Sequence, residues 1–301
     1  MENKNAMMCD AAEGICEIKD TPVEQASAKT AKPVRLLYFT DPICSSCWGI
    51  EPQLRKLKLE YGALFDVEYR MGGLLKSWDE YGGSDVRSAA DVAQHWDEAS
   101  ALYNMPIDGD VWKKDPLTSS YPPSIAVKAA ELQSSEKAVR FLRRIREIVF
   151  VEKKNITRLE NLVQAAVDTG LDAVQFSTDY EGKATELFEE DLRLAKAMGV
   201  RGFPTLFFTD AEGNQFKVYG SKPYEVYVDA LLKLVPAAKP APAPASYETV
   251  LHQHGSVTTK EFAVLNNRNL PEAETILAYL ESQNRIEKIS TKNGPLWRLV
   301  A

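Results

Sequence analysis

The sequence predicts an α/β fold that carries a helical insertion and is followed by a small C-terminal domain. Two apolar runs typical of β-strands, at residues 34–39 and 65–71, flank a segment near 44–61 with helical spacing. A strand, a helix and a second strand in this order form a right-handed βαβ unit. The segment 74–200 is too long for a simple connection and too helical for a loop, so we expect an inserted helical domain.

The remaining elements follow in order along the chain. Gly62 is a typical C-cap and ends the helix after the first strand. A turn cluster at 210–214, followed by a β-run at 215–220, predicts a hairpin. Pro223 begins a closing helix. The helices expected in the insertion cover residues 88–103, 125–132, 141–149, 155–167, 172–179 and 185–198.

Composition divides the chain into four parts. Residues 1–32 carry acids, lysine, alanine and threonine without a sustained period, which predicts a flexible leader. Residues 33–235 form the α/β domain, with its insertion at about 74–200. Alternating alanine and proline at 236–246 predict an extended, semi-rigid linker. Residues 247–301 then form a separate C-terminal domain.

The pattern of the tail is helix, helix, turn, helix and hairpin, which resembles a small winged helix. Such domains often read DNA with the helix after the turn. Here that helix carries Glu272, Glu274 and Glu281 and neither lysine nor arginine. Six basic and six acidic residues leave the tail without net charge. We therefore expect protein contacts or domain support rather than DNA binding.

Charge and hydropathy exclude several classes of partner. The chain of 301 residues has a net charge of −7 and a pI of about 5.3, which argues against nonspecific binding to nucleic acid or anionic membranes. It contains no apolar run of eighteen residues, so we expect no transmembrane helix. Its first residues lack the apolar core of a signal peptide. These features predict a cytoplasmic protein, in which cysteines are more often reactive than structural.

The most informative motif is the Cys-x-x-Cys sequence that joins the first strand to its helix. Cys44 lies at the predicted helix N-terminus, where free amides and the helix dipole stabilise a thiolate. Cys47 follows one turn later on the same face, within reach of a disulfide. An attacking thiolate and a resolving thiol form the minimal unit of dithiol–disulfide exchange.

Two other interpretations of the same spacing stay open. Zinc sites also use Cys-x-x-Cys, but the remaining two cysteines, Cys9 and Cys16, have six residues between them and no histidine lies near a cysteine. The second alternative is a pair of ordinary buried cysteines. We expect neither a metal nor another cofactor. Cys9 and Cys16 are predicted to be free thiols in the leader or an auxiliary redox pair.

A second feature lies far downstream, where Gly202-Phe203-Pro204-Thr205 opens an apolar β-run. Proline cannot donate to a sheet ladder and is confined to strand starts or edges, and a strand-start proline is the simpler interpretation because cis bonds are rare. A dithiol between strand and helix, with this later segment, resembles the thioredoxin fold. The resemblance implies that Pro204 is cis, packs beside the dithiol and helps to present backbone to a substrate peptide.

The chain resembles the DsbA-like superfamily, including its cytosolic FrnE-type dithiol–disulfide isomerases. It is similar, more closely, to the SpxH (YjbH) family of adapters of the ClpXP protease. The second resemblance covers about residues 34–300. The residues that carry it are Asp41-Pro42-Ile43-Cys44, Cys47-Trp48, Glu51-Pro52, residues 57–62, residues 153–157, Pro204-Thr205-Leu206 and Gly294-Pro295-Leu296-Trp297.

The favoured hypothesis is an enzyme, a protein dithiol–disulfide oxidoreductase or isomerase. Cys44 would attack a substrate disulfide or donate its own, and Cys47 would resolve the mixed disulfide. Glu51 is a candidate to move the proton of Cys47, whereas His95 is expected to be an ordinary helix residue. The substrate-binding residues expected beside the catalytic pair are Pro204, Thr205, Phe203 and Trp48.

The alternative hypothesis is an adapter that keeps the fold and uses its surface. By resemblance, it would bind a regulatory protein, such as a thioredoxin-fold transcription factor, and deliver it to ClpXP. The dithiol would then be a redox switch or a relic. The linker and the acidic tail favour this alternative, because an exchange enzyme needs neither.

Overall fold

The computed structural model describes residues 7–10, 15–18, 32–80, 88–244 and 246–300. Its centre is a six-stranded sheet in the order β1-β2-β6-β5-β3-β4. β3 and β4 pair in parallel and the other neighbours are antiparallel. The strands are β1 Met7–Asp10, β2 Ile15–Ile18, β3 Val34–Thr40, β4 Phe65–Met71, β5 Thr205–Asp210 and β6 Gln215–Tyr219.

β3 is the central strand that carries the dithiol at its end. Six of its seven residues are buried, as expected for an apolar run covered on both faces. Two successive helices follow, α1 Ser45–Gly49 and α2 Glu51–Tyr61, and Pro52 lies in the first turn of α2, where its missing amide costs no hydrogen bond. The helix α10 Tyr224–Leu234 packs against α2, β5 and β6.

The insertion between β4 and β5 forms a helical domain with its own apolar core. Ser88, Ser134 and Asp172 begin three of its helices as N-caps, each accepting a hydrogen bond from a backbone amide three residues on. The helices of the insertion are α3 Ala89–Tyr103, α4 Val111–Lys114, α5 Tyr121–Gln133, α6 Ser135–Phe150, α7 Leu159–Asp168, α8 Ala173–Glu181 and α9 Ala184–Ala197.

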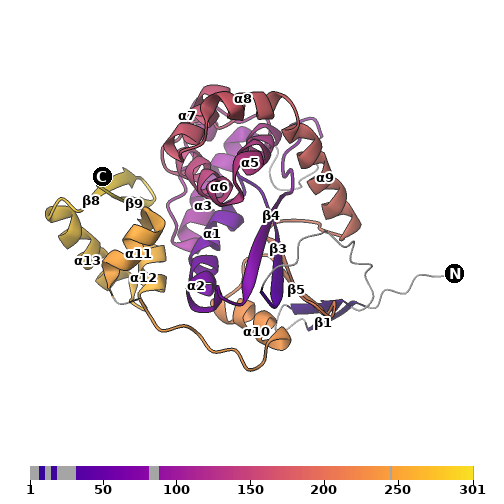
Figure 1. Cartoon of the computed structure of the whole chain (residues 1–301). Coiled ribbons are helices and arrows are strands. Elements are labelled where there is room, and N and C mark those ends of the chain that lie inside the picture. The colour runs from indigo at the N-terminus through magenta and orange to yellow at the C-terminus, as the bar shows by residue number, and fades with distance from the viewer. Residues whose placement is uncertain (1–6, 11–14, 19–31, 81–87, 245, 301) are drawn as a thin grey trace.

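The C-terminal domain combines three helices with a small sheet in the order β7-β9-β8. Capping boxes at Thr258/Glu261 and Asn269/Glu272 begin two of the helices. In Figure 1 this domain lies beside α1, α2 and α3, on the side away from β1. Its elements are α11 Tyr247–His254, β7 Ser256–Thr258, α12 Thr259–Leu265, α13 Leu270–Ser282, β8 Ile286–Thr291 and β9 Gly294–Leu299.

The predicted fold class is confirmed, while a winged helix in the tail stays a prediction. Two local expectations differ from the structure. Residues 7–10 and 15–18 of the expected flexible leader are strands, because β2 pairs with the edge strand β6 and β1 pairs with β2. The helix expected from Asn155 begins at Leu159, because the Asn155 side chain accepts the Thr157 amide at 2.8 Å and forms a turn instead. No helix in the described ranges is long and apolar enough to cross a membrane.

A buried group of charges fixes the C-terminal domain to the helices beside the dithiol. The Glu261 carboxylate is fully buried and accepts two hydrogen bonds from Arg143 of α6, at 2.8 and 3.0 Å. Arg55 of α2 lies 3.3 Å from the same carboxylate and donates to the Ser256 carbonyl at 2.9 Å. The two arginines share this carboxylate. Removing its charge should destabilise the fold, because uncompensated buried charges are costly.

Replacing Glu261→Gln tests how strongly this contact holds the domain. The amide keeps the cap on Thr258 but removes the buried charge that the two arginines share. Arg143 is then left with Glu147, at 2.8 Å, and Arg55 with Glu51, at 3.9 Å. We expect the free energy of unfolding to fall by about 3–5 kcal/mol in urea denaturation, the range for breaking a buried pair. The matched control is Glu248→Gln, which removes an exposed pair with Arg285 and should cost at most about 1 kcal/mol. Equal effects of the two changes would contradict the account.

Candidate functional site

The turn between β3 and α1 holds both cysteines in place. Cys44 is the N-cap of α1, and its sulfur accepts a hydrogen bond from the Cys47 amide at 3.2 Å. Asp41 fixes the preceding turn: its carboxylate accepts from the amides of Ile43 at 3.0 Å and Leu74 at 2.7 Å and from the Ser120 hydroxyl at 2.8 Å. The dithiol is therefore anchored to both the sheet and the insertion.

The loop before β5 meets the dithiol from the other side. The Phe203–Pro204 peptide bond is cis, as the resemblance to the thioredoxin fold implies. The Cys44 thiol donates to the Phe203 carbonyl at 3.8 Å, and the Thr205 hydroxyl donates to Gly202 at 2.7 Å and shapes the loop. The structure thus brings the predicted cysteines and the predicted proline loop together.

The dithiol is almost closed to solvent. Cys44 is 5% exposed and Cys47 is 0% exposed. Of the loop residues, Pro204 and Thr205 are buried and Phe203 is half-buried. Of these three loop residues, Phe203 therefore offers the most side-chain surface beside Cys44.

Trp48 does not occupy the position that the prediction gave it. Its ring is fully buried, stacks on Phe150 with ring centres 5.5 Å apart, and donates to the Pro106 carbonyl at 3.2 Å. The Arg143 guanidinium lies over the ring, 4.2 Å from its centre. Trp48 therefore joins the dithiol helix to α6 and offers no surface to a substrate.

The two thiols differ in their affinity for a proton. Burial raises the pKa of Cys44 well above its usual value, and the neighbouring Cys47 raises it further. Burial also opposes ionisation of Cys47, but the hydrogen bond from Cys44 and the charge of Arg146 outweigh it and lower the pKa of Cys47. The low-pKa thiolate expected on Cys44 stays a prediction; burial of the helix terminus opposes it, and the charge of Arg146 lowers the pKa of Cys47.

Arg146 is the site residue that the sequence analysis missed. It is 1% exposed and donates to Glu51 at 2.5 Å and to Thr40 at 2.5 Å. Glu51, predicted to carry the proton of Cys47, is therefore engaged by an arginine. A signal for Arg146 existed: it lies within the apolar stripe of α6, and a charge on an apolar helix face requires a buried partner.

No group of three or more histidines, cysteines or acids in the described ranges is arranged to hold a metal ion. His95, expected to be an ordinary helix residue, is exposed on α3.

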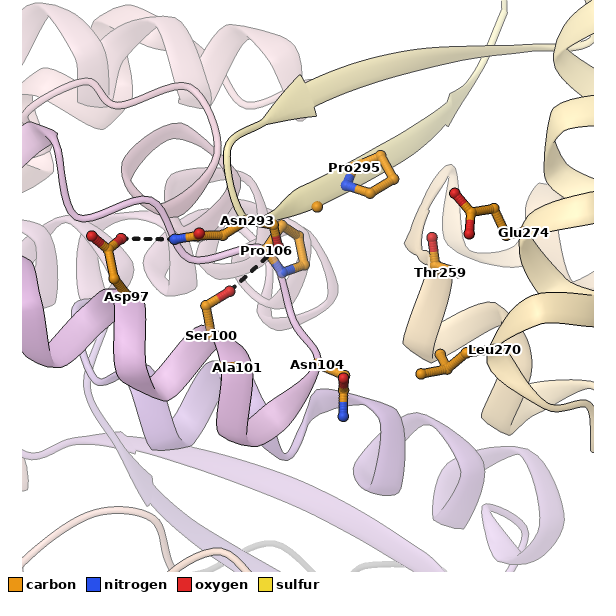
Figure 2. A pocket seen from close by; sticks show the side chains of 11 residues that line it. Asp97, Ser100, Ala101, Asn104, Pro106, Thr259, Leu270, Glu274, Asn293 and Pro295 are labelled. Atoms are coloured by element: carbon orange, nitrogen blue, oxygen red, sulfur yellow. Dashed lines mark hydrogen bonds between the residues drawn. The ribbon is translucent and has the colours of Figure 1, made fainter.

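A cleft lies apart from the dithiol, between α3 and the C-terminal domain. Figure 2 shows this cleft, of about 380 Å³, which neither cysteine lines. Asn293 donates to Asp97 across it at 2.7 Å, and Ser100 donates to the Asn293 carbonyl at 3.4 Å. The cleft therefore marks the contact between the insertion and the tail. It is lined by Asp97, Ser100, Ala101, Asn104, Pro106, Thr259, Leu270, Glu274, Asn293, Gly294 and Pro295.

Comparison with solved structures and family models defines the class of protein. A family model described as thioredoxin matches residues 37–229. A putative protein disulfide isomerase from Nitrosomonas europaea superposes with a TM-score of 0.57 at 24% identity, covering 74% of this chain and all of that one. The cytosolic disulfide reductase DsbM from Pseudomonas aeruginosa gives 0.54 at 25% identity, covering 66% and 99%. The chain is a thioredoxin-fold protein of the DsbA-like type.

Curated relatives define the family more closely. The ClpXP adapter protein SpxH of Halalkalibacterium halodurans is 36% identical over 98% of both chains. The ClpXP adapter protein SpxH of Bacillus subtilis is 33% identical over 89% of both. The chain belongs to this family of SpxH adapter proteins. The favoured prediction of a dithiol–disulfide oxidoreductase or isomerase is wrong, because these relatives are named as adapters and not as enzymes.

The Asp41 carboxyl should make the free energy of unfolding depend on pH. Burial raises the pKa of its carboxyl from 3.8 to about 6, against hydrogen bonds from Leu74, Ile43 and Ser120 that lower it. Between these two values the folded protein holds a proton that the unfolded chain releases, so stability falls as the pH rises. The difference in pKa corresponds to about 3 kcal/mol.

We therefore expect the free energy of unfolding of the unaltered protein to fall by about 3 kcal/mol relative to Asp41→Asn between about pH 3.5 and about pH 7. Urea denaturation of both proteins across this range measures it, and titrations common to both cancel in the difference. A difference that is independent of pH would contradict the assignment.

Proposed function

We propose that the chain is an adapter that binds a regulatory protein and presents it to the ClpXP protease. The thioredoxin family model ends at residue 229, whereas the SpxH relative from Halalkalibacterium halodurans aligns over 98% of this chain. The similarity to an adapter therefore includes the C-terminal domain, which lies outside the thioredoxin match.

The observation that carries the proposal is the attachment of that domain. Buried Glu261 binds Arg143 and Arg55, Leu59 of α2 packs into the core of the C-terminal domain, and Leu296 of that domain packs into the core of the insertion. The two domains thus form one continuous body. A binding protein that must hold a client in one orientation benefits from such a body, because no binding energy is lost in ordering its parts.

The state of the dithiol favours a switch over turnover. Cys44 is buried and its pKa is raised, so it is a poor nucleophile near neutral pH. We assign to Cys44 and Cys47 the role of a redox switch. The cis-proline loop borders the partner surface: half-buried Phe203 supplies the side-chain contact, while Pro204 and Thr205 set the shape of the loop.

The partner is a protein, and by family resemblance a thioredoxin-fold transcription factor. The acidic face of α13, with exposed Glu272 and Glu274, and the net charge of −7 disfavour nucleic acid as a partner. A cytoplasmic location is part of the proposal, and it is supported by the similarity to DsbM, which is named as a cytosolic disulfide reductase.

Affinity measurements with a candidate thioredoxin-fold transcription factor test this proposal. In reducing buffer, Cys44→Ser/Cys47→Ser should bind as tightly as the unaltered protein, within about twofold, because a serine pair imitates the reduced state. Phe203→Asp should weaken binding at least about tenfold, since 1.4 kcal/mol of lost contact energy has this effect. The matched control is Tyr279→Asp on α13, an equally abrupt change at a side chain that is 63% exposed. No binding by the unaltered protein, or binding that requires both cysteines in reducing buffer, would contradict the proposal.

A further inference from the structure

A short segment at the end of α3, residues 103–108, packs on the helix that carries the dithiol. The hydroxyls of Tyr103 and Ser46 share a hydrogen bond of 2.9 Å. A Cβ atom at Gly49 would lie 2.5 Å from the Tyr103 ring, so the ring packs directly on the backbone of α1. We call residues 103–108 the bridging segment.

A second contact joins the bridging segment to the residue after Cys47. The Trp48 indole donates to the Pro106 carbonyl at 3.2 Å, and this acceptor lies in a buried stretch, residues 105–108. Ser46 and Trp48 flank Cys47 in the sequence. A displacement of Cys47 therefore acts first on the two hydrogen bonds that hold α1 to the bridging segment.

The other side of the bridging segment contacts the C-terminal domain. At the turn of the β8–β9 hairpin, the Asn293 amide group donates to the Ile107 carbonyl at 2.7 Å. It also donates to Asp97 of α3 at 2.7 Å, the bond drawn in Figure 2. The Thr258 hydroxyl donates to the Met105 sulfur at 3.2 Å. One short segment thus contacts both the dithiol helix and the C-terminal domain.

We propose that the bridging segment couples the redox state of Cys44 and Cys47 to the seating of the β8–β9 hairpin. The proposal rests on the redox switch assigned above and deepens it, because it names the part of the molecule that responds. The switch has two states, the free dithiol and the disulfide. The hairpin is either seated on the bridging segment or released from it. Energetic coupling needs such two-state elements joined by packed structure, and the bridging segment supplies that structure.

The chemical step is thiol–disulfide exchange with a small-molecule disulfide, RSSR. The Cys44 thiolate attacks one sulfur of RSSR, forms a mixed disulfide and releases RS⁻. The Cys47 thiolate then attacks the Cys44 sulfur of this mixed disulfide and releases the other RS⁻. Two protein thiols and one RSSR become one protein disulfide and two RSH, so the two electrons and two protons pass to the small thiols.

The structure predicts the direction of the coupling. Cys44 and Cys47 are free thiols while the hairpin is seated, so the seated hairpin stabilises the arrangement of α1 that belongs to the free dithiol. Closing the bond brings the two sulfurs to about 2.05 Å and displaces the first turn of α1. By linkage, release of the hairpin then favours the disulfide, and the disulfide favours release by the same factor.

The test measures the equilibrium between dithiol and disulfide in the full chain. All proteins carry Cys9→Ser/Cys16→Ser, so that Cys44 and Cys47 are the remaining cysteines. Each protein is equilibrated with mixtures of reduced and oxidised glutathione, quenched with acid and alkylated. Its disulfide content is read by mass spectrometry, which gives the equilibrium constant for disulfide formation.

Asn293→Ala removes the two hydrogen bonds of the hairpin turn to Ile107 and Asp97. We expect it to raise the equilibrium constant for disulfide formation about fivefold, the lower end of common coupling energies. The matched control is Asn266→Ala, which removes an amide bond of 2.8 Å to Phe262 within the C-terminal domain. The control should change the constant by less than about twofold, because its bond does not reach the bridging segment.

A second variant tests the dithiol side of the bridging segment. Tyr103→Phe keeps the ring on Gly49 and removes only the hydroxyl that bonds Ser46. In this background Asn293→Ala should raise the constant by a smaller factor, because the effects of changes within one network are not additive. A variant that merely loosened the C-terminal domain would have the same effect in both backgrounds.

Two failures are distinguishable. An effect of Asn293→Ala no larger than that of Asn266→Ala, or equal effects with and without Tyr103→Phe, would overturn the coupling and leave the redox switch in place. If glutathione formed no disulfide between Cys44 and Cys47 in any of these proteins, the redox switch and the coupling would both be overturned.

Discussion

The placement of the C-terminal domain depends on one buried carboxylate. Glu261 lies at the start of α12, where it closes a capping box with Thr258 and meets Arg143 and Arg55 from the other domain. The same side chain therefore begins a helix and joins two domains. Since neither arginine is well exposed, losing the charge of Glu261 would leave two buried cations with too little compensating charge.

This arrangement gives the dithiol a buried setting in a chain whose curated relatives are named as adapters. Arg143 covers the Trp48 ring, and Arg146 holds Glu51 and lowers the pKa of Cys47. These contacts bury the helix that carries the cysteines between the sheet, the insertion and the tail. Burial limits the access of solvent and reactants to the dithiol and raises the pKa of Cys44. Both effects suit a redox switch more than an enzyme of rapid thiol–disulfide exchange.

Much of this could be predicted from local pattern, and the rest depends on partners distant in sequence. The strand–dithiol–helix unit, the Ser88 cap and the proline loop beside Cys44 all have short-range signals. The burial of Cys44 and Trp48 has none, because Cys44 contacts Phe203 and Trp48 stacks on Phe150, both more than about 100 residues away in sequence. The strands at 7–10 and 15–18 were not predicted, because they depend on pairing with the edge of β6 and not on a hydrophobic pattern of their own. The function was misjudged for a related reason: a Cys-x-x-Cys motif reports the fold that holds it and not whether turnover occurs.

The central claim is that the chain delivers a client to a protease. The most direct measurement is the rate at which purified ClpXP degrades a thioredoxin-fold transcription factor, with and without this protein, in reducing buffer. The account predicts at least about tenfold faster degradation with the protein present, and the same acceleration with Cys44→Ser/Cys47→Ser, because presentation needs the surface and not dithiol chemistry. No acceleration, or acceleration that disappears with the two serines, would contradict it.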